Sequence, residues 1–105
     1  MPDATIQDGR ILLTRSEDEK QPLLHRLSRV EGQVRGLRKM IEEDRYCLDE
    51  IQQINAASAA LREVALAIIG QHLAAGVQMA ADEGEKGLAT DDVMRVLRAA
   101  MRQDH

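Results

Sequence analysis

One apolar stripe, running from residue 47 to residue 79, constrains the fold of this chain more than any other feature. Its members follow one another in alternating steps of four and three: Cys47, Ile51, Ile54, Ser58, Leu61, Ala65, Ile68, His72, Ala75 and Met79. That spacing places them on one face of an α-helix, which we predict from about residue 46 to 81, roughly 50 Å long. A chain of 105 residues cannot cover such a helix by itself. The stripe is therefore expected to pack against a second copy.

Two residues of the types that bind metals lie on this stripe, Cys47 near one end and His72 toward the other. They are separated by roughly 37 Å of helix and cannot meet within one chain. Their midpoint lies between Ala59 and Ala60, in the run of small side chains at 56–60 that allows helices to approach closely. Two copies packed antiparallel about a two-fold axis would bring each Cys47 to the partner's His72, giving two equivalent sites.

A thiolate and an imidazole together allow more than one chemistry. The pair suits Cu(I), Zn or Ni. It also suits a reactive thiol, because a nearby imidazolium lowers the pKa of a cysteine. Each residue alone is also common in packed cores, where cysteine behaves as a small apolar side chain. The symmetry of the spacing is what favours a shared site.

The composition favours a single all-α domain that is not an enzyme. Tyr46 is the only aromatic residue, so the core must be built from aliphatic side chains and methionine. The lone cysteine argues against a disulfide framework and suits the reducing cytoplasm. No continuous apolar run reaches the roughly 20 residues of a membrane span, so no membrane association is expected. No glycine-rich phosphate loop, nucleophile elbow or HExxH motif is present.

Two further helices are predicted around the long one. Residues 1–17 show no sustained period and no strand signal, and are interpreted as a flexible arm preceding a folded domain at 18–105. Ser16 and Glu19 form a candidate capping box for a first helix from about 18 to 43. A turn is expected at 43–46 and a polar loop at 82–87. Thr90 is expected to cap a short third helix.

The charge is distributed unevenly along the chain, whose net charge is −4. Residues 20–46 carry seven positive and four negative charges, whereas the segments on either side are both net acidic. This local excess suits contact between the first helix and the phosphates of a nucleic acid, although the same residues also suit a solvated helix face. The basic residues concerned are Arg26, Arg29, Arg35, Arg38 and Lys39.

The segments RVEGQV at 29–34, YCLDEIQQI at 46–54 and HL at 72–73 resemble the CsoR/RcnR family of bacterial repressors. The resemblance covers about residues 20–103. It implies a three-helix protomer with one long central helix, forming an antiparallel four-helix-bundle dimer that assembles into a tetramer. It also implies binding to operator DNA without a helix-turn-helix, and release when an effector occupies the Cys/His site. Effectors in the family include Cu(I), Ni(II) or Co(II), formaldehyde and sulfane sulfur.

The chain departs from the copper-sensing pattern at one position. That branch of the family uses a second cysteine four residues after the histidine, where this chain has Gly76. A two-coordinate Cu(I) site at Cys47 and His72 is the favoured interpretation. Nickel and cobalt fit less well because they require more nitrogen and oxygen ligands. A sulfur-reactive sensor is an alternative, but the persulfide-sensing branch also uses a second cysteine, which is absent here.

The resemblance also suggests supporting residues. Tyr46 and Asp92 match positions that, in the copper-sensing branch, are proposed to couple the histidine to the DNA-binding surface, with aspartate here in place of the longer glutamate. Arg26 matches a basic position of the first helix. A second basic position, in the long helix, is Glu63 in this chain.

Two other functions remain open from the sequence. The formaldehyde-sensing branch uses a cysteine and the amine of a proline that follows the initiator methionine, and this chain begins Met1-Pro2. Pro2 lies 45 residues before Cys47, and the aldehyde would bridge the two provided that an extended arm spans this separation. The remaining alternative is a helical structural or adaptor oligomer with a basic patch and no effector.

Overall fold

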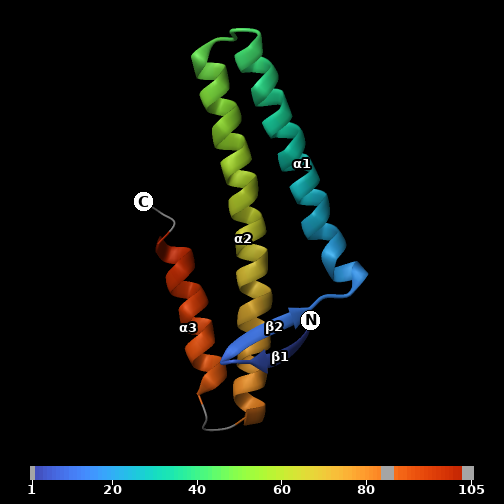
Figure 1. Ribbon diagram of the computed structural model, residues 1–105, viewed down its shortest axis with the longest axis vertical. Coiled ribbons are helices and arrows are strands. Elements are labelled where there is room, and N and C mark those ends of the chain that lie inside the picture. Colours follow the sequence, from blue (N-terminus) through green and yellow to red (C-terminus); the bar gives the residue numbers. More distant parts are fainter. Residues whose placement is uncertain (1, 84–86, 103–105) are drawn as a thin grey trace. The chain divides into compact units, whose positions relative to one another are not determined.

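The computed structural model describes residues 2–83 and 87–102, and in these ranges a β-hairpin precedes three helices (Figure 1). The two strands and three helices are β1 (Asp3–Gln7), β2 (Arg10–Thr14), α1 (Glu17–Glu42), α2 (Cys47–Glu83) and α3 (Leu88–Met101). The chain forms two compact units. The first unit comprises residues 1–20 together with 66–105, and the second comprises residues 21–65, so α2 contributes to both. The prediction of three helices with one long central helix is confirmed.

Helix α1 begins with the predicted capping box. The Ser16 backbone N–H donates to Glu19 Oε1 at 2.7 Å, and the Glu19 backbone N–H donates to Ser16 Oγ at 3.2 Å. The bond from the Ser16 backbone lowers the pKa of the Glu19 carboxyl. The capping contribution of this carboxylate is therefore present at neutral pH and is lost as the pH falls through the lowered pKa. Two residues separated by three positions were enough to predict the start of this helix.

The turn between α1 and α2 lies where the sequence predicts it. Asp44 adopts the left-handed conformation with φ of 54°, and the Arg45 N–H donates to the Met40 carbonyl at 2.9 Å. The Tyr46 carbonyl then accepts the N–H groups of Asp49 and Glu50 at 3.0 and 3.2 Å. Tyr46 therefore begins the hydrogen bonding of α2, and Cys47 is the first residue of that helix.

The N-terminal segment is a β-hairpin, and the expectation that it lacks strands was wrong. Strands β1 and β2 pair antiparallel, from Asp3 opposite Thr14 to Gln7 opposite Arg10. Asp8 and Gly9, with φ of 53° and 73°, connect them as a two-residue turn with both residues left-handed. An Asp-Gly pair between alternating apolar residues is a strong hairpin signal. Because each strand is only five residues long, its period of two was too short to stand out.

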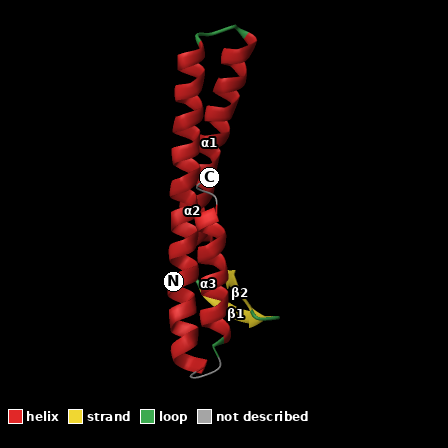
Figure 2. Cartoon of the chain, turned by 90° about the vertical axis from the view of Figure 1, so that its left-hand side faces the viewer, coloured by secondary structure: helices red, strands yellow, loops and turns green. Residues whose placement is uncertain are grey.

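The apolar face of the hairpin forms a small core with the C-terminal part of α2 and with α3 (Figure 2). Ile11, Ala75 and Ala89 are buried at its centre. The partly buried residues packed against them are Ala4, Ile6, Leu13, Met79, Ala80 and Val93. The hairpin therefore covers the end of the stripe that contains His72.

Helix α3 begins three residues before the predicted position, because its N-cap is Gly87 and not Thr90. Gly87 precedes the helix with φ of 73°, and its carbonyl accepts the Asp91 N–H at 2.9 Å. The earlier start places Ala89 in the core with no exposed surface. The central part of the polar loop predicted at 82–87, residues 84–86, lies outside the described residues.

Most of the remaining stripe residues are exposed within a single chain. Ile51, Ile54 and Leu61 are 51%, 41% and 48% exposed, whereas Ala75 is only 2% exposed. By length and composition alone, α2 is apolar enough from Cys47 to Asp82 to cross a membrane, contrary to the expectation drawn from continuous apolar runs. Only 22% of its most apolar window is buried in the chain. The first half of α2 therefore has an apolar face that requires a cover.

Candidate metal centre and nucleic-acid interface

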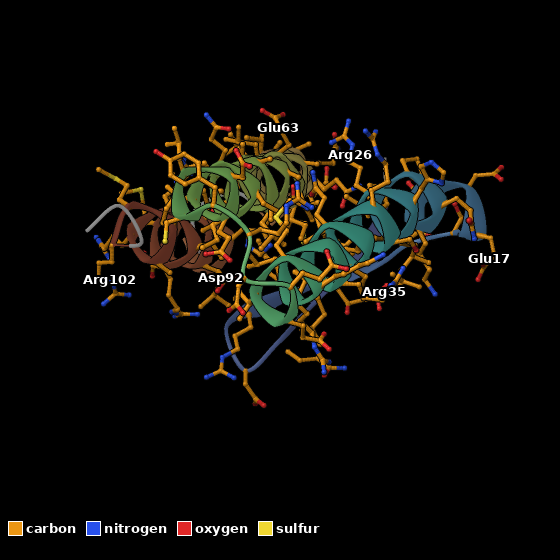
Figure 3. All side chains as sticks on the ribbon, turned by 90° about the horizontal axis from the view of Figure 1, so that it is seen from above. Glu17, Arg26, Arg35, Glu63, Asp92 and Arg102 are labelled. Atoms are coloured by element: carbon orange, nitrogen blue, oxygen red, sulfur yellow. The ribbon has the colours of Figure 1, made fainter. Side chains whose placement is uncertain are left out.

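The most connected polar group of the first unit is the carboxylate of Asp92, on α3 (Figure 3). Asp92 is 3% exposed. Its Oδ2 accepts the backbone N–H of Ile11 at 2.9 Å and lies 3.0 Å from His72 Nε2. Its Oδ1 accepts a hydrogen bond from Arg95 Nη1 at 2.6 Å. Three elements, β2, α2 and α3, thus converge on one buried carboxylate, which offsets the cost of burying its charge.

This contact determines how the His72 imidazole is presented. His72 lies on α2 and is 9% exposed. Because an ionised carboxylate only accepts hydrogen bonds, the His72 tautomer that suits this contact carries its proton on Nε2. Nδ1 is then the nitrogen through which His72 would bind a metal. A histidine that donates its second N–H to a carboxylate is the usual arrangement of a metal-ligating histidine.

Cys47 belongs to the other unit and is an exposed free thiol. Across residues 2–83 and 87–102, no three His, Cys, Asp or Glu side chains gather closely enough to hold a metal ion. Tyr46, beside Cys47, is 69% exposed, and its proposed coupling to the histidine stays a prediction.

Gly76 stands where the copper-sensing pattern has a second cysteine, and neighbouring side chains leave no room for a side chain there. A Cβ atom at Gly76 would collide with Val93 Cγ2 and would lie 3.4 Å from Ile11 Cδ1. No side chain at this position can reach a metal without a shift of Val93. The side-chain donors at the two positions predicted from the sequence are the thiol of Cys47 and the imidazole of His72. A thiolate and an imidazole are ligand types that suit Cu(I), whereas Ni(II) favours a larger set of nitrogen and oxygen ligands.

The close contact between Gly76 and Val93 predicts that a larger residue at position 76 destabilises the fold. Gly76→Ala is expected to lower the free energy of unfolding by about 1–3 kcal/mol, because the added methyl group overpacks the contact with Val93. Gly70→Ala is a matched control on the same helix, since a Cβ there meets nothing within 4 Å. The control should be neutral or slightly stabilising. Urea denaturation of both variants measures the difference, and equal stabilities would contradict this packing.

The basic residues of α1 divide into two groups. Arg26 and Arg29 line a groove of about 220 Å³ within the second unit, together with Gln33, Ala60 and Glu63. Arg35 lies nine residues after Arg26, about 180° around the helix, and the two side chains point to opposite sides of α1 (Figure 3). Glu63 reaches the groove from α2, so two guanidinium groups and one carboxylate line the same depression.

The remaining basic residues, Arg38 and Lys39, are exposed and fall on the side of α1 that carries Arg35. The five residues predicted to bind DNA therefore do not form one surface on a single copy of the chain. The sequence analysis treated the five basic residues as one group and did not separate the two faces of the helix. Helical spacing alone would have done so, because residues 26 and 29 are neighbours on one side.

Pro2 does not lie on an extended arm. It is buried, and the pairing of Asp3 with Thr14 folds the N-terminus back along β2. The N-terminal segment is therefore a paired hairpin and not an extended arm. The formaldehyde bridge between Pro2 and Cys47 stays a prediction.

Comparisons with known proteins agree with these features. Residues 19–99 match the family model described as metal-sensitive transcriptional repressor. The chain is 51% identical over 69 residues to the copper-sensing transcriptional repressor RicR of Mycobacterium tuberculosis, which covers 66% of this chain and 72% of that protein. It is 39% identical over 91 residues to the copper-sensing transcriptional repressor CsoR of Bacillus subtilis, covering 87% and 90% of the two chains. The crystal structure of the copper-sensing repressor CsoR with Cu(I) from Geobacillus thermodenitrificans superimposes with a TM-score of 0.75 at 38% identity, covering 84% of this chain and 92% of that one.

Proposed function

The chain belongs to the metal-sensitive transcriptional repressors, and on that premise we propose that it binds operator DNA and releases it when Cu(I) binds. The Cu(I) site would lie between two copies, with Cys47 from one and His72 from the other. The family consists of transcriptional repressors, in agreement with the expectation that the chain is not an enzyme. The observation that carries the proposal is the hydrogen bond of His72 Nε2 to Asp92, which leaves Nδ1 to face a ligand.

The choice of Cu(I) rests on the donors and on the relatives. A thiolate and an imidazole are soft and borderline ligands, and Cu(I) accepts as few as two of them. The packing of Val93 against Gly76 excludes a third side-chain ligand at that position. The relatives from Mycobacterium tuberculosis and Bacillus subtilis are both named as copper-sensing repressors. Together these facts favour Cu(I) over nickel, formaldehyde or sulfane sulfur as the effector.

The proposed assembly is an antiparallel homodimer that pairs into a tetramer and acts in the cytoplasm. It is supported by the exposed stripe residues Ile51, Ile54 and Leu61 on the first half of α2. Burying an apolar side chain of this size contributes about 1.5–3 kcal/mol, so a second copy gains substantially by covering them. An antiparallel partner would also bring its own Cys47 to the end of α2 that carries His72.

The proposed DNA contact is the groove that contains Arg26 and Arg29. Guanidinium groups bind phosphate oxygens through paired, charge-assisted hydrogen bonds. Two or more copies in one assembly would repeat this pair along the DNA backbone, so the affinity should fall steeply with salt. Cu(I) would then favour a form of the assembly that presents the arginines poorly. A coupling free energy of about 1–3 kcal/mol is typical of such a link.

A mobility-shift titration with the DNA upstream of its own gene tests this function. We expect a shifted complex at low salt that dissociates when Cu(I) is added under reducing, oxygen-free conditions. Ni(II) and formaldehyde are added separately as controls, and neither should dissociate the protein–DNA complex. Absence of any complex at low salt would favour the adaptor oligomer instead. Release by formaldehyde and not by Cu(I), with a methylene-bridge mass gain that Pro2→Ala removes, would identify the aldehyde as the effector.

A further inference from the structure

We propose that the β1–β2 hairpin is part of the effector site, where Ile11 positions the His72 imidazole through Asp92. The hairpin ends at Thr14, before the segment that matches the family model, which begins at residue 19. The inference rests on the proposed function only for the identity of the ligand. The positioning itself concerns groups that the structure places in contact.

The backbone of β2 supplies a hydrogen-bond donor that the hairpin does not use. Gln7 and Arg10 flank the two-residue turn, so Ile6 and Ile11 form the next pair. In an antiparallel ladder this next pair does not exchange hydrogen bonds, and the Ile11 N–H therefore points away from β1. It donates instead to Asp92 Oδ2 at 2.9 Å. An edge-strand amide, which would otherwise bind water, fixes the carboxylate oxygen that contacts His72.

The side chain of Ile11 closes the same region against solvent. Ile11 is 5% exposed and packs with Ala75 and Ala89. Its Cδ1 would lie 3.4 Å from a Cβ atom at Gly76. One residue thus supplies a donor to Asp92 through its backbone and fills the space beside Gly76 through its side chain. In these dry surroundings the contact between Asp92 and His72 is stronger than it would be in water.

Arg95 links the carboxylate to the hairpin turn. Its Nη1 donates to Asp92 Oδ1 at 2.6 Å and also contacts the Gly9 carbonyl at 3.4 Å. The turn conformation is thereby connected to both oxygens of Asp92, through Arg95 at one oxygen and Ile11 at the other. Loosening the turn should free the carboxylate to rotate and should weaken its hold on His72 Nε2. The hairpin acts as a positioning element and contributes no metal ligand of its own.

The test strains the turn without changing Ile11, Asp92 or His72. Asp8 is exposed and left-handed, with φ of 53°. Asp8→Val places a β-branched residue where that conformation is unfavourable, whereas Asp8→Asn removes the same charge and favours the turn. Both are made in the full-length protein. The readouts are hydrogen exchange at the Ile11 amide, the His72 tautomer from ¹⁵N NMR of the imidazole, and Cu(I) affinity from competition with a chromophoric chelator.

The expected result separates the two variants. Asp8→Val should speed exchange at Ile11, reduce the population with the proton on Nε2, and weaken Cu(I) binding by roughly 10-fold or more, as lost partners of metal ligands do. Asp8→Asn should match the wild type in all three readouts. Arg95→Gln, which removes the guanidinium contacts without straining the turn, should change the tautomer and the affinity in the same direction as Asp8→Val.

Two outcomes would overturn the inference. One is faster exchange at Ile11 with an unchanged His72 tautomer and unchanged Cu(I) affinity in Asp8→Val. The other is an unchanged tautomer in Arg95→Gln, which applies even if Asp8→Val fails to fold. If the wild type itself does not bind Cu(I), the proposed function fails, but the tautomer comparison still decides whether the hairpin positions His72.

Discussion

A Cys47→Ala variant should bind operator DNA as the wild type does but should remain bound when Cu(I) is added. Cys47 is exposed at the start of α2, so its truncation removes little buried surface and should leave the fold intact. The residues proposed to contact DNA, Arg26 and Arg29, lie on α1. Loss of the only thiol should weaken Cu(I) binding by more than about 100-fold, since even the removal of groups that orient a ligand costs 10–100-fold.

The measurement is a DNA-binding titration by fluorescence anisotropy, with and without Cu(I). Cys47→Ser is the matched variant, because it keeps the size of the side chain and replaces soft sulfur with hard oxygen. It should behave as Cys47→Ala does. Release of DNA by Cu(I) from either variant would show that Cys47 is not the ligand. His72 is a poorer target for this test, since it is buried and paired with Asp92.

Mixed dimers test whether the site is shared between two copies. A dimer of one Cys47→Ala chain and one His72→Gln chain keeps one intact pair, if the thiol comes from one copy and the imidazole from the other. It should bind Cu(I) at half the wild-type stoichiometry with wild-type affinity. If both ligands came from the same chain, the mixed dimer would have no intact site and would bind none.

Local features of this fold could be predicted from the sequence because they depend on short-range spacing. The capping box depends on Ser16 and Glu19 alone, and α1 begins within one residue of its predicted position. The long helix follows from a stripe that extends over many turns. At the start of α3, Thr90 is a good N-cap residue by type, but burial of Ala89 moved the start of the helix to Leu88. Tertiary packing there overrode the local preference.

The contacts that organise the candidate site are long-range and could not be predicted from spacing. Ile11 and Asp92 are 81 residues apart in the chain, and His72 and Asp92 are 20 apart on different helices. The family resemblance pointed to His72 and Asp92, but it gave no reason to include Ile11. The sequence showed only that Gly76 lacks a ligating side chain. The structure adds that Val93 fills the space beside Gly76, so no replacement ligand can occupy that space. The Asp-Gly pair at residues 8–9 could have predicted the hairpin, but no sequence signal indicates that the hairpin contacts Asp92 on α3.

A Glu63→Arg variant should bind operator DNA more tightly than the wild type. Glu63 lines the same groove as Arg26 and Arg29, so its carboxylate repels any phosphate that docks there. Arginine would replace that repulsion with a further charge-assisted hydrogen bond, for a gain of about 1.5 kcal/mol or roughly tenfold in affinity. The plot of log affinity against log salt should steepen by about 0.9 for each additional phosphate that the variant neutralises.

The control is Glu31→Arg, which makes the same charge change elsewhere on α1. Glu31 is exposed and lies about 140° around the helix from Arg26, on the side that carries Arg35 and Arg38. If the groove is the phosphate-binding surface, Glu31→Arg should change the affinity only slightly, through net charge. Anisotropy titrations of both variants across a salt series make the comparison. A gain for Glu31→Arg that equals or exceeds the gain for Glu63→Arg would move the DNA surface to the opposite side of α1, away from Arg26.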